Sequence, residues 1–279
     1  VYRLARLWLE RDQALLAGLL VYCLPWTSVL LRTYYVEIPT IFLLVVSLYL
    51  ISNPNFQGKR RYLLAGLILG ASAGVKYTTL FLGTFALIPV MILSNEPWRI
   101  KARGVFQLAI GFLLAFSPWL LRNYLHTGNP IYPLFNPWLA PGYWSELMYA
   151  RFRQAHAPPN LALSEMMRCL WRTFVVHAHI SLLFVMLLPG VGLLMRRRWW
   201  SLAGFTAIWL GLWLGFTHRI SRFVYVVSVL ACVPMGAVLW FYWRSLPRRL
   251  ANAVLVVIAL MTFYHHSYLT ISGVYDYLL

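Results

Sequence analysis

The sequence is poor in charged residues and especially poor in acidic ones. Only 11% of its 279 residues are charged, and seven Asp and Glu stand against 24 Lys and Arg. A soluble domain usually carries about 25% charged residues, so a water-soluble globule is excluded. The 61% hydrophobic content indicates a polytopic membrane protein instead. The net charge of +17 does not indicate a nucleic-acid partner, because the basic residues form small clusters between apolar runs.

Patterns that bind metals, cofactors or nucleotides are also lacking. The three cysteines, Cys23, Cys169 and Cys232, are far apart, which excludes a disulfide framework. His177 and His179 lie two residues apart and would face different sides of a helix, so we expect no metal site. We also expect no cofactor, and the sequence gives no support for a divalent cation. A Walker loop, a dinucleotide fingerprint and a Ser-His-Asp arrangement are absent.

Apolar segments account for most of the chain, and we read about nine of them as membrane segments. They cover residues 13–31, 38–51, 62–77, 78–94, 104–121, 174–195, 201–217, 223–243 and 250–265. Some are shorter than the ~20 residues that a perpendicular helix needs, so tilt or partial re-entry is expected. Because lipid satisfies no backbone hydrogen bonds, the sequence predicts an all-α bundle of about nine helices that forms a single domain over residues 1–279.

Basic clusters predict how these segments are oriented. The clusters lie at residues 3–11, 59–61, 99–103, 196–198 and 244–249. Such clusters mark cytoplasmic loops, and two predicted segments separate each cluster from the next. This even spacing puts all five clusters on one side and requires a turn near Lys76.

The remaining polar regions are therefore expected on the far side of the membrane. They include Glu37, Lys76, a long loop insertion over residues 122–173 and the turn at 218–222. Nine cations would lie there against the usual bias: Arg32, Lys76, Arg122, Arg151, Arg153, Arg168, Arg172, Arg219 and Arg222. Cations outside the cytoplasmic loops indicate an anionic ligand at that surface.

The long external loop is expected to be ordered. Residues 127–133 are rich in turn formers. Residues 143–156 predict an amphipathic helix on the membrane surface, with Leu147, Met148 and Phe152 on its apolar side. Pro158-Pro159 would end this helix. Ser164 is then expected to cap a second short helix that carries Arg168 and Arg172 at i,i+4 spacing, and a loop of this length is typical of a lid or a binding surface.

Two single charged residues are the first candidates for a functional site. Glu37 lies at the edge of a membrane segment, where a carboxylate is costly unless it faces water or a partner; a snorkelling carboxylate at a helix end is the alternative. Lys76 follows a run of small residues, Gly70 to Gly74, that allows close helix packing. Its compact charge suits a phosphate oxygen, and a snorkelling lysine is the alternative.

Two further groups of cations are candidates for the same chemistry. His218, Arg219 and Arg222 are spaced so that one helical face would present them together, and arginine reads phosphate with two parallel hydrogen bonds. A solvated turn in contact with lipid headgroups is the alternative. Arg122 and Asn123 follow Ser117-Pro118-Trp119, and here the alternative is a plain arginine at a helix exit.

The motifs, taken in order, resemble a known family. Four stretches carry the likeness: Tyr34-Tyr35-Val36-Glu37, Gly74-Val75-Lys76-Tyr77-Thr78, Ser117-Pro118-Trp119 through Arg122-Asn123-Tyr124 to Thr127-Gly128-Asn129-Pro130-Ile131-Tyr132-Pro133, and His218-Arg219 through Phe223-Val224-Tyr225. They resemble bacterial GT-C-type glycosyltransferases that use polyprenyl-phosphate sugars, relatives of the protein O-mannosyltransferases and the lipid A aminoarabinose transferases. Glu37 stands where Asp is more usual in that family.

The resemblance implies transfer of a hexosyl or pentosyl group from a polyprenyl-phosphate donor to an unknown acceptor outside the cytoplasm. It implies a bacterial inner-membrane protein with its active site facing the periplasm or exterior. Donor phosphate would be held by Lys76, Arg219, Arg222, His218 and Arg122. Substrate-loop residues would be Asn123, Asn129, Tyr132 and Tyr77. The catalytic candidate is Glu37, which would act as general base or orient the acceptor or sugar.

One departure from the family concerns the catalytic Asp, which in the family lies in the first external loop. No such loop occurs here, so we expect that helices upstream of Val1 have been lost and that this chain is inactive without them.

Three other functions fit the same composition. A transporter or flippase of an anionic lipid-linked saccharide would need charges near the bilayer midplane and symmetry-related repeats, and neither is present in the sequence. An O-antigen ligase or polymerase uses a similar donor class, with a large external loop and arginines. A non-catalytic scaffold subunit is the third.

Overall fold

The structure is a computed structural model. It describes residues 1–33, 35–53, 56, 60–156, 160–176, 199–250, 252–253, 256, 260, 263–264 and 267. Regular structure in these residues is helical, with no strand among them. The chain forms two compact units. Unit 1 comprises Val1–Ile38, Leu163–Thr206 and Ser221–Leu279, and unit 2 comprises Pro39–Ala162 and Ala207–Ile220.

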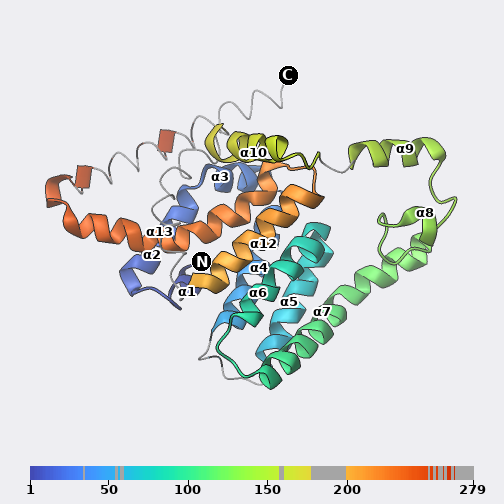
Figure 1. Ribbon diagram of the computed structural model, residues 1–279, viewed down its shortest axis with the longest axis horizontal. Coiled ribbons are helices and arrows are strands. Elements are labelled where there is room, and N and C mark those ends of the chain that lie inside the picture. The colour runs from blue at the N-terminus through green and yellow to red at the C-terminus, as the bar shows by residue number, and fades with distance from the viewer. Residues whose placement is uncertain are drawn as a thin grey trace. The chain divides into compact units, whose positions relative to one another are not determined.

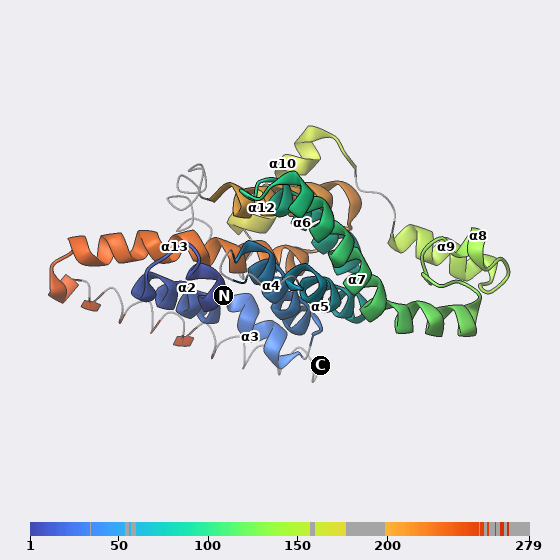
Figure 2. The same cartoon turned by 90° about the horizontal axis from the view of Figure 1, so that it is seen from below.

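Unit 1 is built around the contact between its second and last long helices. Its elements are α1 (Tyr2–Ala5), α2 (Arg11–Cys23), α3 (Pro25–Arg32), α10 (Leu163–Trp171), η2 (Arg172–Val176), the start of α12 (Trp200–Phe216), η4 (Ser221–Val224) and α13 (Tyr225–Ser245). Helices α2 and α13 lie side by side in both views (Figures 1 and 2). A Cβ on Gly236 would come within 2.3 Å of the Gln13 carbonyl oxygen, so only glycine allows this approach.

Helices α2 and α3 form a bent pair. Leu24 adopts an extended conformation between them, and Pro25 starts α3, where its missing N–H costs nothing. The two helices are bent by 55°. The predicted segment 13–31 is therefore one apolar stretch broken in the middle.

Unit 2 is built around α5 and α7. Its elements are α4 (Glu37–Ser52) from Pro39 onward, α5 (Arg61–Val75), η1 (Thr79–Gly83), α6 (Thr84–Ile92), α7 (Trp98–Thr127), α8 (Asn136–Leu139), α9 (Glu146–Ala155) and the end of α12. Helices α5 and α7 run alongside each other, and α7 continues past α5 toward α8 and α9 (Figures 1 and 2).

Glycines let α5 and α7 touch backbone to backbone. An added Cβ would meet the Leu108 carbonyl oxygen at 2.1 Å from Gly66, and the Phe112 carbonyl oxygen at 2.3 Å from Gly70. From the other side, a Cβ on Gly111 would meet the Leu63 carbonyl oxygen at 2.2 Å. Small residues at four-residue spacing permit this close packing in membrane helices. Gly70, the first residue of the predicted run, thus packs closely as expected, whereas nothing lies within 4 Å of a Cβ added to Gly74.

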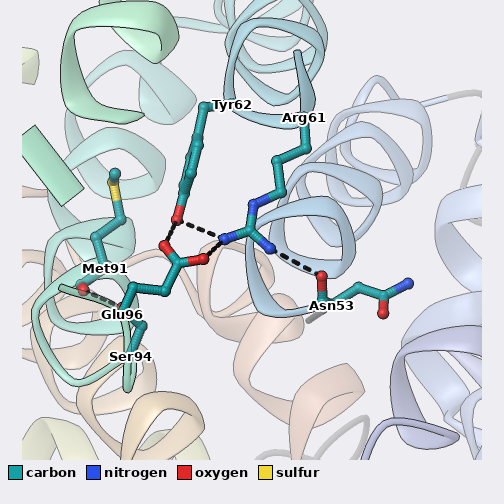
Figure 3. A network of polar contacts seen from close by, with 6 residues as sticks. All are labelled: Asn53, Arg61, Tyr62, Met91, Ser94 and Glu96. Carbon is teal, nitrogen blue, oxygen red and sulfur yellow. Dashed lines mark hydrogen bonds and ion pairs between the residues drawn. The ribbon is translucent and has the colours of Figure 1, made fainter. Parts of the chain in front are cut away.

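An ion pair between Arg61 and Glu96 lies at the end of the α5–α7 pair where both helices begin (Figure 3). The Arg61 guanidinium contacts the Glu96 carboxylate and donates to the Asn53 carbonyl at 3.0 Å and to the Tyr62 hydroxyl at 2.9 Å. The Tyr62 hydroxyl also donates to Glu96. Because Arg61 is almost fully buried, these contacts offset its desolvation. The network therefore fixes the start of α5 against the segment that leads into α7.

The predicted membrane segments largely coincide with helices. Seven of them match α2–α3, α4, α5, η1–α6, α7, α12 and η4–α13, and the break at Lys76 is confirmed. Residues 98–127 and 221–245 are long and apolar enough to cross a membrane, and the bent α2–α3 pair would make a third span. The other four helices are shorter. Segments 174–195 and 250–265 lie mostly outside the described residues, so a count of nine stays a prediction.

Several predicted boundaries in the external loop are wrong. Helix α7 continues to Thr127, six residues into the predicted loop, because the first helix-ending residue is Gly128, which takes a left-handed conformation with φ of 73°. Helix α9 begins at Glu146 rather than at 143, because the Ser145 hydroxyl accepts the Met148 N–H and caps it.

The second helix of the loop also differs from its prediction. Helix α10 already begins at Leu163, so Ser164 lies inside its first turn and does not cap it. Arg168 forms an exposed ion pair with Glu165 at 3.0 Å, whereas Arg172 lies in the π-helical η2, outside α10. The i,i+4 relation between the two arginines is thus interrupted. Pro158-Pro159 lies outside the described residues.

Candidate functional site

Within unit 1 the structure brings two of the predicted site residues into contact. Glu37 is the first residue of α4, where the end of the helix dipole favours a negative charge. Arg222 lies in η4, and its Nε is 3.0 Å from the Glu37 Oε1. Residues 185 positions apart in the sequence thus form one ion pair, in which the side chain of Glu37 is 5% exposed and that of Arg222 28%.

Two aromatic rings complete the surroundings of Arg222. Its guanidinium carbon lies 4.5 Å from the ring centre of Tyr35 and 5.8 Å from that of Phe223. Arginine stacks well on such faces because it is weakly hydrated and planar. The guanidinium is thus held by the Glu37 carboxylate through Nε and by aromatic faces.

A second buried contact holds the segment that carries Arg222. The hydroxyl of Tyr225, at the start of α13, hydrogen-bonds the Thr27 hydroxyl of α3. Thr27 in turn donates to the Val21 carbonyl of α2 at 2.6 Å, across the break between α2 and α3. Arg222 therefore sits three residues from a fixed point, which limits its freedom relative to Glu37.

In unit 2, Lys76 lies in a gap between two helices. It is extended, with φ of −154° and ψ of 126°, and its N–H donates to the Ser72 carbonyl at 3.0 Å. The fully buried Ser72 hydroxyl contacts the Thr40 carbonyl at 3.1 Å and the Thr79 hydroxyl at 3.2 Å. These bonds tie both sides of the gap together, so the backbone at Lys76 is fixed.

The residue after Lys76 joins three segments of unit 2. The Tyr77 hydroxyl accepts from the indole N–H of Trp119 at 2.7 Å and from the Nδ2 of Asn123 at 2.8 Å. It donates to the Tyr132 carbonyl at 2.5 Å. The break after α5, the end of α7 and the following loop are thereby connected through one oxygen atom. Tyr77 and Asn123, predicted as substrate-loop residues, thus serve here as internal supports.

Asn129 and Tyr132 shape the same loop. Asn129 is fully buried, accepts the Ile131 N–H at 3.0 Å and donates to the Leu134 carbonyl at 2.7 Å. An asparagine side chain that replaces backbone partners in this way stabilises a turn. The Tyr132 hydroxyl accepts the Trp144 indole N–H at 2.8 Å, which attaches the turn to the start of the α9 region.

His218 and Arg219 lie in the non-helical turn after α12. The prediction that they share a helical face with Arg222 is wrong, because residues 218–220 are not helical and Arg219 has a left-handed φ of 54°. The Arg219 side chain donates to the Leu214 carbonyl at 2.9 Å and to the Asn160 carbonyl at 2.7 Å. Arg219 thus holds the external loop to this turn.

His218 reinforces the same attachment. Its ring meets the ring of His156, the residue after α9, edge-to-face with centroids 4.8 Å apart. His156 is also stacked on Phe152 at 4.1 Å. Burial lowers the pKa of His218, and the neighbouring His156 lowers it further. The neutral form of His218 is therefore favoured at this contact.

Arg122 occupies a more open position. It is an exposed residue within α7, and its guanidinium carbon lies 5.1 Å from the ring centre of Trp119. Among the described residues, no group of three or more His, Cys, Asp or Glu could hold a metal ion.

Some residues of these clusters were not singled out by the sequence. Tyr35 and Trp119 lie inside the quoted motifs, yet single aromatic residues in a membrane protein are more typical of interfacial anchors. His156, Asn160 and the Thr27–Tyr225 pair carry no sequence signal, because their partners are distant in the chain.

Comparison with protein families gives one match. Residues 1–121 match the family described as dolichyl-phosphate-mannose-protein mannosyltransferase. The match confirms the resemblance to GT-C glycosyltransferases and supports a membrane glycosyltransferase in general terms. It includes Glu37, Lys76 and Trp119, and it ends one residue before Arg122. No curated protein and no solved structure gives a significant match.

Proposed function

We propose that the protein transfers a sugar from a polyprenyl-phosphate donor to an acceptor on the extracytoplasmic side of a bacterial inner membrane. The family match supports a lipid-linked sugar as donor. The observation that carries the proposal to this site is the position of Arg222. Its side chain is partly exposed, it is held by Glu37 and by aromatic rings, and it lies in a segment that the sequence predicts to be outside the cytoplasm. Such a group suits an anionic headgroup at the bilayer surface.

The reaction breaks the bond between the anomeric carbon of the sugar and a phosphate oxygen. A new bond forms between that carbon and an acceptor oxygen, the acceptor proton passes to a base, and polyprenyl phosphate leaves with an added negative charge. Arg222 and Lys76 are proposed to stabilise this charge, because preorganised cations are most effective where charge develops. Glu37 can serve such a site as the base or by orienting another group.

The other cations are proposed to contribute less directly. Arg122 is exposed and free to meet a headgroup, whereas Arg219 and His218 are engaged in holding the external loop. Tyr77, Asn123, Asn129 and Tyr132 are proposed to set the position of Lys76 and of the loop that follows α7.

The experiment uses full-length protein in liposomes that contain a polyprenyl-phosphate sugar with a radiolabelled sugar. We expect release of polyprenyl phosphate together with labelled acceptor. Lys76→Ala and Arg222→Ala should abolish transfer with expression unchanged, whereas Arg249→Ala, an exposed arginine of a predicted cytoplasmic cluster, should retain it.

The same assay separates the alternatives. A flippase would move the labelled lipid across the bilayer without releasing polyprenyl phosphate. A ligase or polymerase would act on a diphosphate-linked saccharide and leave the monophosphate donor intact. Full activity of both the Lys76→Ala and the Arg222→Ala variants would rule out their role in phosphate binding.

A further inference from the structure

We infer that Glu37 is a positioning residue for Arg222 and not the general base. Its carboxylate holds the Nε edge of the guanidinium, which turns the Nη edge toward the donor phosphate. This inference rests on the proposed function, because it assigns Arg222 to the phosphate of the donor.

The contact geometry is the first support. A guanidinium has five N–H donors in a fixed plane, one on Nε and four on the two Nη atoms. The Glu37 Oε1 lies 3.0 Å from Nε and forms an ion pair with it, without the alignment of a hydrogen bond. Among the described residues, the remaining contacts of Arg222 are the faces of Tyr35 and Phe223, which take none of its in-plane donors. The four Nη donors therefore stay available for the two-pronged hydrogen bonding that phosphate accepts.

The difference in exposure between the partners is the second support. The side chain of Arg222 is 28% exposed, whereas that of Glu37 is 5% exposed. A general base must come within hydrogen-bond reach of the proton that it removes. A ligand from outside therefore reaches the Arg222 side chain more readily than the Glu37 side chain.

The elements that carry the pair supply the third support. Glu37 begins α4, and Arg222 lies three residues before Tyr225, whose hydroxyl is bonded to the buried Thr27. The segment that carries Arg222 is thus attached to a fixed point of unit 1, and Glu37 is held at the first turn of a helix. A carboxylate held in this position keeps the arginine in one orientation before the ligand arrives. The affinity for the ligand rises because less conformational entropy of the arginine side chain is lost on binding.

The test compares four full-length proteins: wild type, Glu37→Gln, Arg222→Gln and the double variant. Two quantities are measured, the binding of polyprenyl phosphate in detergent micelles and the separate values of kcat and KM for the donor. The double variant removes both charges, so it leaves no uncompensated buried charge and keeps the test usable should a single variant fold poorly.

We expect Glu37→Gln to weaken polyprenyl-phosphate binding about tenfold and to raise the donor KM by a similar factor, as loss of an oriented charge-assisted contact predicts. We expect the double variant to bind no more weakly than Arg222→Gln alone, because Glu37 acts through Arg222. The acid limb of the pH profile of kcat should persist in Glu37→Gln.

Three outcomes would overturn the inference. If Glu37 is the base, Glu37→Gln binds polyprenyl phosphate like wild type, loses kcat by roughly 10²- to 10⁴-fold, and loses the acid limb. If Glu37 is merely structural, the yield of folded protein falls while the folded fraction binds normally. If wild type neither binds polyprenyl phosphate nor transfers sugar, the proposed function itself fails, and this result is distinct from the first two.

Discussion

The hydroxyl of Tyr77 accepts a hydrogen bond from the side-chain amide of Asn123 at 2.8 Å, across 46 residues of sequence. The same hydroxyl accepts the indole N–H of Trp119 and donates to the Tyr132 carbonyl. The gap that contains Lys76 is therefore attached to α7 through the Tyr77 hydroxyl as well as through ring contacts of Tyr77 with Phe116 and Trp119, and removal of the hydroxyl tests the polar part of this attachment.

Tyr77→Phe should loosen the loop after α7. Trp119 would lose the acceptor of its indole N–H, and Asn123 would lose its shortest hydrogen bond while it keeps those to the Pro130 and Tyr132 carbonyls. A lost hydrogen bond costs about 0.5–1.5 kcal/mol, so we expect a lower Tm in detergent and faster proteolysis near residues 128–135. Tyr124→Phe, at an exposed position of the same helix, is the control and should leave both unchanged. Equal behaviour of the two variants would contradict the role given to the Tyr77 hydroxyl.

Gly66→Ala should destabilise the contact between α5 and α7. The new Cβ would lie 2.1 Å from the Leu108 carbonyl oxygen, which is backbone and cannot rotate away. Overpacking of this kind costs typically about 1–3 kcal/mol or more. Gly74→Ala is the matched control in the same helix, because nothing lies within 4 Å of its added Cβ. There the higher helix propensity of alanine should keep or slightly raise the Tm, and a similar loss in both variants would argue against backbone contact.

Glu96→Gln should destabilise the network at the start of α5. It removes the charge that faces Arg61, whose side chain is only 9% exposed. Loss of one partner of a buried pair costs about 3 kcal/mol. The double variant Arg61→Met/Glu96→Gln removes both charges and should unfold at a higher temperature than Glu96→Gln alone. A double variant less stable than the single one would show that the two residues act independently.

Acid should loosen the attachment of α9 to the turn after α12. The pKa of His218 is lowered from its ordinary 6.5 in the folded protein, so the folded state binds fewer protons than the unfolded one. The stabilising effect of the neutral ring is fully present above pH 6.5 and is lost as the pH falls through the lowered pKa. The protection of residues 146–156 against hydrogen exchange, relative to the intrinsic rate at each pH, should therefore fall on acidification, and His218→Phe should remove that dependence. Protection that does not change with pH in wild type would disprove the effect.

Local patterns allowed much of the fold to be predicted from the sequence. Apolar runs between basic clusters gave the helices α4, α5, α7, α12 and α13, and small residues predicted close packing at Gly70. The bounds of α7 and α9 were missed, because they depend on the first glycine in a left-handed conformation and on which serine accepts a backbone N–H.

The candidate site was harder to predict, because its contacts join distant segments. The sequence singled out Glu37 by the cost of a carboxylate in a membrane and Arg222 by its expected place outside the cytoplasm and its spacing from Arg219, and nothing in it indicates that they pair. Asn123 and Asn129 were interpreted as substrate contacts, whereas their side chains support the loop internally. The convergence of Lys76, Arg122 and the unit 1 pair on one face of the membrane stays a prediction.

The backbone contact between α5 and α7 has a mechanical consequence. Sliding motions of helices depend on a layer of side chains that can change rotamers, and here the glycines leave no such layer. The two helices must move together, and Tyr77 couples the backbone at Lys76 to them. The backbone of Lys76 is thus attached to a rigid pair of helices. A mobile lipid headgroup that binds there would have to adjust its own position to that of the lysine.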